Sequence, residues 1–392
     1  MKILYIANGN GTSPIIGGSL KRTAEISSRL ESYGWKVDFL TTSGGHTALG
    51  SKFSATFHVV RSSLLSRAES SPLDRLISYA LATFFSLFVI LRLERFDLVY
   101  SDSDYFCDVV PAVWAKLRWK AKWIAMSHHI LNFGRLSDPR QVLSNFSALS
   151  QRFSFLFFQM YADSVFLLNS SAGKEEAKYL VSRGVGVERI RLVMNGVDLA
   201  LIDEISTGSA QSSYDACFIG GIRPRKGTED LVSIWSHVVS RIPNALLLII
   251  GGGLQSYERA FRERIVERGL QKNIVVAGYV PWKQLISRLK DSRLFISPSR
   301  EEGWGMAVCE AMACGVPVVA YDLPAYRDFG ESLARIPVGD QSAFADTIVS
   351  LLTREDLRMK MALLGKTRVA EFDWNDIAKR ESILLQNMMR EL

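Results

Sequence analysis

Short apolar runs of strand length alternate with helical stretches from one end of the chain to the other, and this alternation limits the possible fold most strongly. Strands that alternate with helices form parallel sheets covered by helices. The strand-like runs are residues 2–7, 36–42, 97–101, 122–127 and 164–170 in the first half, and 215–221, 245–253, 273–280, 293–299 and 316–322 in the second. The sequence therefore predicts an α/β fold with doubly wound, Rossmann-like sheets.

Two domains are predicted, because 392 residues exceed the usual size of one domain and the strand–helix rhythm restarts in the second half. Asn195-Gly196 is a strong turn signal, so we expect an N-terminal domain over residues 1–195 and a C-terminal domain over residues 196–374. Ligands of such sheets bind beyond the carboxyl ends of the strands. We therefore expect the site in loops that follow strands, in a cleft between the domains.

The net charge of +7 belongs to the first half, where residues 1–200 carry 23 Lys/Arg against 16 Asp/Glu, while residues 201–392 carry 24 of each. No basic block with interleaved aromatic residues marks a nucleic-acid groove. The expected partner of the basic half is an anionic membrane surface or an acidic acceptor.

Residues 76–91 are 16 uncharged residues in a row. A helix of that length covers about 24 Å, less than the roughly 30 Å of a hydrocarbon core. A buried helix, or one that dips partly into a membrane, is therefore favoured over a transmembrane helix.

The apolar run after Met1 and Lys2 is too short for a signal peptide. The four cysteines, at positions 107, 217, 309 and 314, form no CxxC pair. We expect reduced, mostly buried thiols in a cytoplasmic protein.

Glycines follow the first strand-like run, but Pro14 occupies the third position of the pattern that Gly9 and Gly11 begin, so a GxGxxG dinucleotide fingerprint is absent. Gly17 and Gly18 lie at a predicted helix start, where backbone amides can approach a phosphate. A role as simple turn formers is equally open.

A cationic loop follows the strand-like run at residues 215–221. Arg223, Arg225, Lys226 and Gly227 come between this run and a predicted helix. Arginine forms forked bonds with phosphate and lysine supplies a compact charge, so these residues can clamp a pyrophosphate. A solvated charged loop is the alternative.

Two glutamates, Glu302 and Glu310, lie eight positions apart across the junction of an apolar strand and a helix. Gly303 and Gly305 expose backbone amides beside Glu302 at this junction. Glu310 lies inside the helix and either faces a ligand hydroxyl or faces solvent.

His128 and His129 end a strand of the first domain, and only one of two adjacent strand residues can face the cleft. Asp102 and Asp104 form a DxD pair. For this pair a solubilising or helix-capping role is favoured over magnesium binding, which needs further ligands.

Glu302-Gly303-Trp304-Gly305 with Glu310 resembles the E-x7-E signature of the retaining glycosyltransferases of family 4. The segments FIGGIRPRKG, LVMNGVD and FDLVYSDSD are similar to other segments of that family, and the C-terminal FDWNDIAKR resembles the start of its helix that returns to the first domain. The resemblance implies the two-domain GT-B fold, with a returning helix over about residues 375–392.

The resemblance also implies roles for single residues. Glu310 would bind the ribose and Glu302 the donor sugar, while Lys226 and the backbone amides of Gly303, Trp304, Gly305 and Met306 would hold the diphosphate. Gly18 would approach that diphosphate, and His128, with His129 as the alternative, would be the cleft histidine. The family often has Gly-Arg where this chain has Gly220-Gly221, so we expect Arg223 or Arg225 to replace the missing arginine.

By this resemblance the chain is a retaining hexosyltransferase that uses a nucleoside-diphosphate sugar, with no protein nucleophile, no cofactor and no metal. The preorganised cations and a helix N-terminus would stabilise the departing diphosphate. The expected acceptor is a glycan or a lipid-linked glycan at the cytoplasmic membrane face, with a soluble acceptor as its rival. A nucleotide-sugar 2-epimerase and a non-catalytic GT-B partner subunit remain alternatives.

Overall fold

The structure is a computed structural model, and it describes residues 1–9, 17–50, 55–61, 72–128, 130–131, 142–206 and 213–390. The chain forms two compact units. Unit 1 contains Met1–Asn195 and Trp374–Leu392, and unit 2 contains Gly196–Asp373. The division falls at Asn195-Gly196, and the last helix belongs to the first unit.

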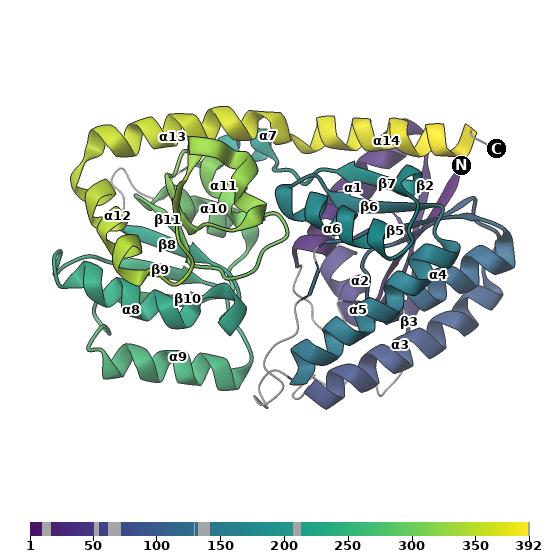
Figure 1. Ribbon diagram of the computed structural model, residues 1–392, viewed down its shortest axis with the longest axis horizontal. Helices are drawn as coiled ribbons and strands as arrows, with labels where there is room; N and C mark the ends of the chain where they lie inside the picture. Colours follow the sequence, from purple (N-terminus) through teal and green to yellow (C-terminus); the bar gives the residue numbers. More distant parts are fainter. Residues whose placement is uncertain are drawn as a thin grey trace. The chain divides into compact units, whose positions relative to one another are not determined.

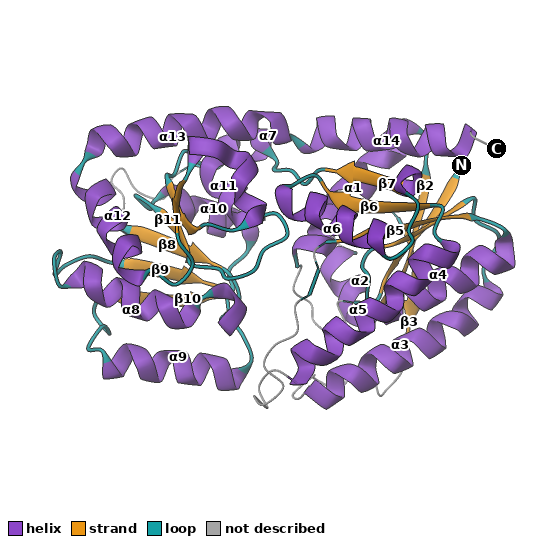
Figure 2. Ribbon diagram, in the orientation of Figure 1, coloured by secondary structure: helices purple, strands orange, loops and turns teal. Residues whose placement is uncertain are grey.

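The described part of unit 1 contains a seven-stranded parallel sheet in the order β3-β2-β1-β4-β5-β6-β7. Its strands are β1 Lys2–Ala7, β2 Lys36–Thr42, β3 Thr56–Val60, β4 Leu98–Ser101, β5 Lys122–Ser127, β6 Ser164–Leu168 and β7 Ile190–Val193. The central strands are buried almost throughout, as expected for a parallel sheet covered on both faces. Figure 2 shows this sheet with its covering helices.

The helices of unit 1 are α1 Gly18–Leu30, α2 Ser43–Leu49, α3 Pro72–Arg92, α4 Phe106–Trp119, α5 Val142–Tyr161, α6 Ser171–Ser182 and α14 Trp374–Arg390. Helix α4 packs against both α3 and α5, and the three lie side by side in Figure 1. Within the part of the chain that the structure describes, none of the helices is both long enough and apolar enough to cross a bilayer.

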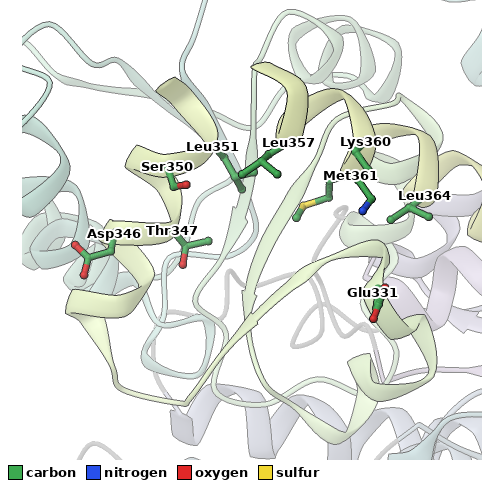
Figure 3. Close-up of a pocket in the computed structure, with 9 residues that line it drawn as sticks. All are labelled: Glu331, Asp346, Thr347, Ser350, Leu351, Leu357, Lys360, Met361 and Leu364. Atoms are coloured by element: carbon green, nitrogen blue, oxygen red, sulfur yellow. The ribbon is translucent and has the colours of Figure 1, made fainter. Parts of the chain in front are cut away.

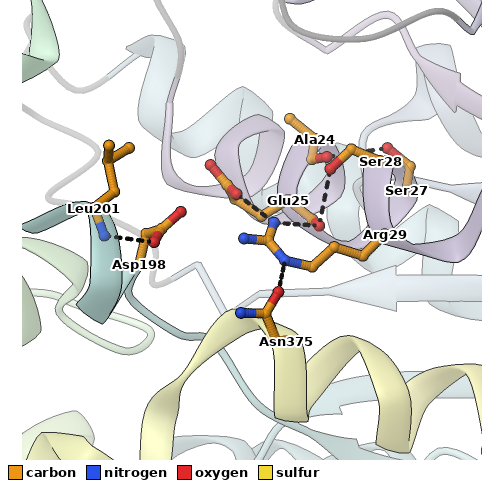
Figure 4. Close-up of polar contacts among 8 residues, drawn as sticks. All are labelled: Ala24, Glu25, Ser27, Ser28, Arg29, Asp198, Leu201 and Asn375. Atoms are coloured by element: carbon orange, nitrogen blue, oxygen red, sulfur yellow. Dashed lines mark hydrogen bonds and ion pairs between the residues drawn. The ribbon is translucent and has the colours of Figure 1, made fainter. Parts of the chain in front are cut away.

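Helix α14 returns to unit 1 and packs on α1. Arg29 of α1 donates to the side chain of Asn375 at 2.8 Å, as Figure 4 shows. Deeper in the interface, the Arg22 guanidinium forms an ion pair with Glu381, and both side chains are at most 2% exposed. A buried ion pair therefore holds the C-terminal helix to the first helix of the unit.

The described part of unit 2 contains a six-stranded parallel sheet in the order β10-β9-β8-β11-β12-β13. The strands are β8 Ala216–Ile219, β9 Leu247–Ile250, β10 Ile274–Gly278, β11 Phe295–Ser297, β12 Val318–Tyr321 and β13 Ala334–Ile336. The helices are α7 Leu199–Glu204, α8 Thr228–Val239, α9 Gln255–Glu267, α10 Trp282–Lys290, α11 Met306–Ala313, α12 Gln341–Thr353 and α13 Glu355–Val369, with short 3₁₀ turns η4 Pro224–Lys226, η5 Pro324–Ser332 and η6 Ala370–Phe372.

The helix predicted between the first two strands of unit 2 is present as α8. Leu231, Ile234, Trp235 and Val238 lie in the core as their spacing predicts. Ile242, which continues the same pattern, lies beyond the end of the helix at Val239. At the start of the unit, the Asp198 carboxylate accepts a hydrogen bond from the Leu201 amide and so caps α7 (Figure 4).

Three edge strands, β3, β7 and β13, are absent from the sequence prediction. Strands β3 and β7 each have only one fully buried residue, and β13 has three residues, of which one is exposed. Short, half-exposed edge strands lack the continuous apolar run that identifies a central parallel strand.

Candidate active site

The candidate site in unit 2 is built from the loops that follow two neighbouring strands, β8 and β11, which pair in parallel. The first loop contains η4 with Arg225 and Lys226, and the second contains Glu302 and leads into α11. The Arg300 amide donates to the Arg225 carbonyl at 2.9 Å, so the two loops are joined by their backbones. These residues therefore lie at the carboxyl ends of two parallel strands, which is where sheets of this kind bind their ligands.

Gly227 allows the two loops to approach each other. It has φ +66°, and a Cβ atom at this position would lie 1.7 Å from the carbonyl oxygen of Pro298. Any side chain would both strain the backbone and push the loops apart.

Lys226 and Glu302 form an ion pair between the two loops. Burial alone would raise the pKa of Glu302, but the Lys226 ammonium, a hydrogen bond from Ser299 and the charge of Arg223 together lower it below the usual value. Glu302 is therefore an ionised carboxylate that fixes the Lys226 ammonium in place.

The two arginines of the first loop have different surroundings. The Arg225 guanidinium lies 3.6 Å from the Glu301 carboxylate. The Arg223 side chain is exposed. The charge of Arg223 still acts on Glu302, because it contributes to the lowered pKa of that carboxylate.

Helix α11 begins at Met306, close to Glu302 in the sequence, and its N-cap Gly305 provides no side-chain hydrogen bond. Gly305 has φ +96°, and a Cβ atom there would lie 2.5 Å from the ring of Tyr326. The positive end of this helix and its first amides can thus receive an anion without competition from a capping side chain. Gly303 and Met306 flank this start, as the sequence predicts.

The Trp304 side chain packs into the core of unit 2. It is buried and packs edge-to-face against Phe329 and Phe372, with ring centroids 6.1 Å and 5.4 Å away. The indole is therefore part of the core of unit 2 and anchors the glutamate loop.

Glu310 is buried in α11, so the solvent-facing alternative is wrong. The Trp282 indole N–H donates to Glu310 Oε1 at 2.9 Å. Trp282 is the first residue of α10 and was not singled out by the sequence, because nothing in its local pattern reveals a partner 28 positions away.

A second anchor holds the glutamate loop on α8. The Arg300 guanidinium donates to the Asp230 carboxylate at 2.7 Å, and Asp230 also accepts from Tyr321 at 3.1 Å and Gln341 at 2.9 Å. Asp230 is thus a buried acceptor that ties the loop before α11 to helices α8 and α12.

The cavity drawn in Figure 3 lies apart from these residues. It has a volume of about 480 Å³ and is lined by residues of α12, α13 and η5, among them Leu351, Leu357 and Met361. None of the predicted donor-binding residues lines it. The candidate site is therefore defined by its charged side chains and backbone amides.

The predicted residues of unit 1 lie at the carboxyl edge of its sheet. Gly18 is the exposed first residue of α1, whose N-cap Gly17 provides no side-chain hydrogen bond. His128 directly follows β5, is partly buried, and its Nε2 lies 2.9 Å from the Asp102 carbonyl oxygen. His129 lies outside the described residues.

The DxD pair is buried, so its predicted solubilising role is wrong, and α4, the helix that follows it, has no side-chain hydrogen bond at its N-cap, Tyr105. Thr23 donates to the Asp102 carboxylate, and Ser127 and Gln151 donate to Asp104 at 2.6 Å and 2.8 Å. Burial raises the pKa of Asp102 to about 6, although the hydrogen bond from Thr23 and the charge of Arg22 both act to lower it. The two aspartates organise the loop that supports His128.

If Glu310 binds the donor, as the resemblance implies, we expect Trp282→Phe to weaken donor binding, because the substitution keeps an aromatic ring but leaves Glu310 without its indole donor. The loss of a hydrogen bond to a charged group costs about 1.5–3 kcal/mol, so an increase of roughly tenfold or more in the donor KM is predicted. Steady-state kinetics with varied donor would measure it. Trp235→Phe, which removes a buried indole bonded to the Asn273 carbonyl, is the matched control for loss of stability. An unchanged donor KM would show that Glu310 needs no support from α10.

Comparison with known proteins agrees with this architecture. Residues 16–201 match the family described as Glycosyltransferase Family 4, and residues 203–368 match Glycosyl transferases group 1. The phosphatidyl-myo-inositol mannosyltransferase of Mycobacterium leprae is 30% identical over 198 residues, which cover 48% of this chain and 51% of that protein. The D-inositol 3-phosphate glycosyltransferase of Corynebacterium efficiens is 26% identical over 243 residues, covering 58% of this chain and 57% of that protein.

These alignments span only about half the length of the two curated relatives. Among solved structures, the sucrose-phosphate synthase of Thermosynechococcus elongatus matches with a TM-score of 0.79 at 18% identity, over 100% of both chains. That likeness shows the GT-B fold. The two family matches together cover nearly the whole chain, and the chain therefore belongs to the family 4 glycosyltransferases of GT-B architecture.

Proposed function

We propose that the protein is a retaining hexosyltransferase that takes its sugar from a nucleoside-diphosphate donor. The observation that carries the proposal is the Lys226–Glu302 ion pair beside the uncapped start of α11. In the proposed complex, Lys226 and the amides of residues 303–306 bind the diphosphate, Glu302 binds hydroxyls of the sugar, and Glu310 binds the ribose. Gly18 and His128 of unit 1 are the proposed contacts to the diphosphate and to the sugar and acceptor.

In the proposed reaction, the acceptor oxygen forms a bond to the anomeric carbon as the bond from that carbon to the β-phosphate oxygen breaks. The acceptor hydroxyl passes its proton to the departing phosphate oxygen, and attack occurs on the face that the leaving group vacates. Negative charge grows on the diphosphate during this step. Lys226 and the positive end of α11 stabilise that charge.

The proposed acceptor is a lipid or a lipid-linked glycan at a membrane surface. The name of the Mycobacterium leprae relative gives a lipid, phosphatidyl-myo-inositol, as its substrate. The positive balance of the first half of the chain also favours an acidic or membrane-bound acceptor. The Corynebacterium efficiens relative is named for a soluble inositol phosphate, so a soluble acceptor is the rival to be tested.

A donor screen tests the proposed function. Purified protein is incubated with UDP-, GDP- and ADP-sugars, and thermal stabilisation, donor hydrolysis and transfer to lipid and soluble acceptors are measured. We expect one base to stabilise the protein and its sugar to be transferred with retention of the anomeric configuration, read by NMR. Inversion would contradict the mechanism, conversion of donor alone to an epimer would indicate a 2-epimerase, and binding without turnover would indicate a partner subunit.

We expect Arg223→Ala to lower donor turnover more than Arg225→Ala does, because the charge of Arg223 acts on Glu302, whereas the Arg225 guanidinium lies beside Glu301. Turnover at saturating donor measures the difference. Arg262→Ala, an exposed arginine of α9, is the control for loss of one positive charge. If both loop variants turned over donor at the wild-type rate, neither arginine would replace the one that the family has at position 221.

Activity is expected to persist after treatment with EDTA, because the proposed stabilisation of the diphosphate comes from Lys226 and a helix N-terminus. Transfer rates before and after dialysis against EDTA, and after addition of Mg²⁺, should agree within about twofold. Loss of activity that Mg²⁺ restores would contradict this proposal.

A further inference from the structure

The outer surface of three helices in unit 1 is apolar. Among the described side chains, large apolar residues that are at least 40% exposed are concentrated on α3, α4 and α5. We call these residues the apolar face: Ile77, Phe84, Phe88 and Leu91 of α3; Phe106, Trp114 and Leu117 of α4; Phe146, Leu149, Phe153, Leu156 and Met160 of α5. Six of the twelve are aromatic. Soluble monomers rarely expose apolar side chains in contiguous groups of this kind.

Helix α5 shows that the exposure follows helical periodicity. Its exposed residues recur at spacings of three and four and form a stripe on one side of the helix. The opposite side is buried and includes Gln151, Phe155 and Phe158. A surface helix normally turns its polar side outward. Here the outward side is the apolar stripe, so the pattern predicts a further apolar partner outside the unit.

The three helices form one continuous layer. Helix α4 packs on both α3 and α5, so their outer sides adjoin (Figure 1). The Arg118 guanidinium of α4 donates to the Leu91 carbonyl at the end of α3, at 3.0 Å, and joins the two helices at one end of the layer.

The charge at the edge of this layer is mainly positive. Arg92 at the end of α3, Arg95 beyond it, Arg118 in the last turn of α4 and Lys120 beyond that helix are exposed cations. The exposed acid of the same edge, Glu94, is paired with Lys2 at 3.0 Å. The described side chains of the three helices include no exposed acid, since Asp108 is buried and Asp74 is half-buried.

We propose that the apolar face binds the surface of an anionic lipid bilayer, with its aromatic side chains at the headgroup level and the four cations of its edge against the lipid phosphates. Aromatic side chains favour this interfacial depth, and basic residues favour anionic lipid. The proposal rests on the proposed function, because a lipid-linked acceptor is presented at such a surface. It names the part of the enzyme that binds there.

The charges favour a bilayer over a second copy of the chain as the occupant. In a two-fold symmetric dimer, the apolar face of one copy would pack against the apolar face of the other. Each copy would bring four exposed cations to this edge, and its exposed acid, Glu94, already pairs with Lys2 of the same copy, so like charges would dominate the contact. An anionic bilayer supplies the apolar layer and the negative charge together.

Vesicle binding of the full chain tests the proposal. Phe153→Ser/Leu156→Ser on α5 and Phe84→Ser/Phe88→Ser on α3 are compared with Met359→Ser/Leu363→Ser on α13 of unit 2, whose side chains are even more exposed. With vesicles of phosphatidylglycerol and phosphatidylcholine, we expect each unit 1 pair to reduce partitioning at least tenfold and the α13 pair to leave it unchanged. Equal loss in the α13 control, or no loss in either unit 1 pair, would overturn the proposal.

The cations are tested separately. Arg92→Gln/Arg95→Gln should reduce the preference for anionic over zwitterionic vesicles at least threefold. Arg262→Gln/Arg268→Gln, which removes the same charge from α9 and the residue after it, should not. An equal reduction in both would show that total charge, and not this edge, selects the lipid.

Two readouts separate this proposal from its rivals. Light scattering in the absence of lipid should give a monomer for the wild type and all variants. If the wild type were a dimer and the α5 pair a monomer, the apolar face would instead bind a second copy of the chain. Thermal stabilisation by the cognate nucleotide-sugar, measured without vesicles, should be the same in the α5 pair and the wild type. The nucleotide-sugar could fail to stabilise both the wild type and the α5 pair, while vesicle binding is lost in the α5 pair and kept in the wild type. In that case the proposed donor is wrong, and the apolar face still binds lipid.

Discussion

Lys226→Ala is expected to lower kcat for sugar transfer by about a hundredfold or more. The Lys226 ammonium is held by Glu302 where the loop after β8 meets the loop after β11, and in the proposed complex it faces the growing charge of the diphosphate. Loss of one preorganised group that stabilises transition-state charge typically costs about 3–4 kcal/mol. Initial rates at saturating donor and acceptor measure the effect. Lys272→Ala, an exposed lysine of the same unit, should have the wild-type rate.

A double variant separates chemistry from structure at this position. Lys226→Ala alone leaves the Glu302 carboxylate without its cation, which disturbs the loop and raises the pKa of Glu302 toward the value that burial favours. Adding Glu302→Gln removes that unpaired charge. If Lys226 acts on the diphosphate, the double variant stays as inactive as Lys226→Ala and is far less active than Glu302→Gln alone. Activity of the double variant equal to that of Glu302→Gln alone would show that Lys226 only holds the loop together.

Glu381→Ala is expected to destabilise unit 1 by about 3–5 kcal/mol, because it leaves a buried arginine without a counter-charge. Arg22 is buried, and the neighbouring Glu381 carboxylate outweighs the cost of that burial, so the pKa of Arg22 is raised. Hydrogen exchange of the amides in α1 and α14 reports on this unit separately from unit 2. Asp346→Ala, which removes the partner of Arg241 in an exposed ion pair, should cost only about 0–1 kcal/mol.

The double substitution Arg22→Met/Glu381→Leu tests the reason for this loss. A buried ion pair replaced by apolar residues of similar volume is often neutral or stabilising. We therefore expect the double variant to recover most of the protection that Glu381→Ala loses. If the double variant were as unstable as Glu381→Ala, the contacts of Arg22 with Tyr100 and the Met194 carbonyl, at 3.2 Å and 3.3 Å, would carry the stability instead.

The central architecture could be predicted from the sequence because parallel strands and amphipathic helices have strong local patterns. The strands at residues 98–101 and 295–297 are short, mostly apolar runs that are buried throughout, and Leu231 and Trp235 have the spacing of a buried helical face. The glycines at 227 and 305 were part of the predicted loops, and the structure gives their physical reason in close contacts with Pro298 and Tyr326.

Features that depend on distant partners could not be predicted. Asp102 and Asp104 have the composition of a solvated loop, and only Thr23, Ser127 and Gln151 from other elements make their burial possible. The support of Glu310 by Trp282 is equally invisible in the local sequence. In α5, the periodicity locates an apolar stripe, but only the packed unit shows that this stripe lies outside.

The most direct test of the account is a crystal structure of the full chain with its nucleotide-sugar bound. The account predicts the β-phosphate within hydrogen-bonding distance of Lys226 and of the first amides of α11, with Glu310 on the ribose. A diphosphate bound elsewhere, for example in the cavity between α12 and α13, with Lys226 still paired to Glu302 alone, would contradict it.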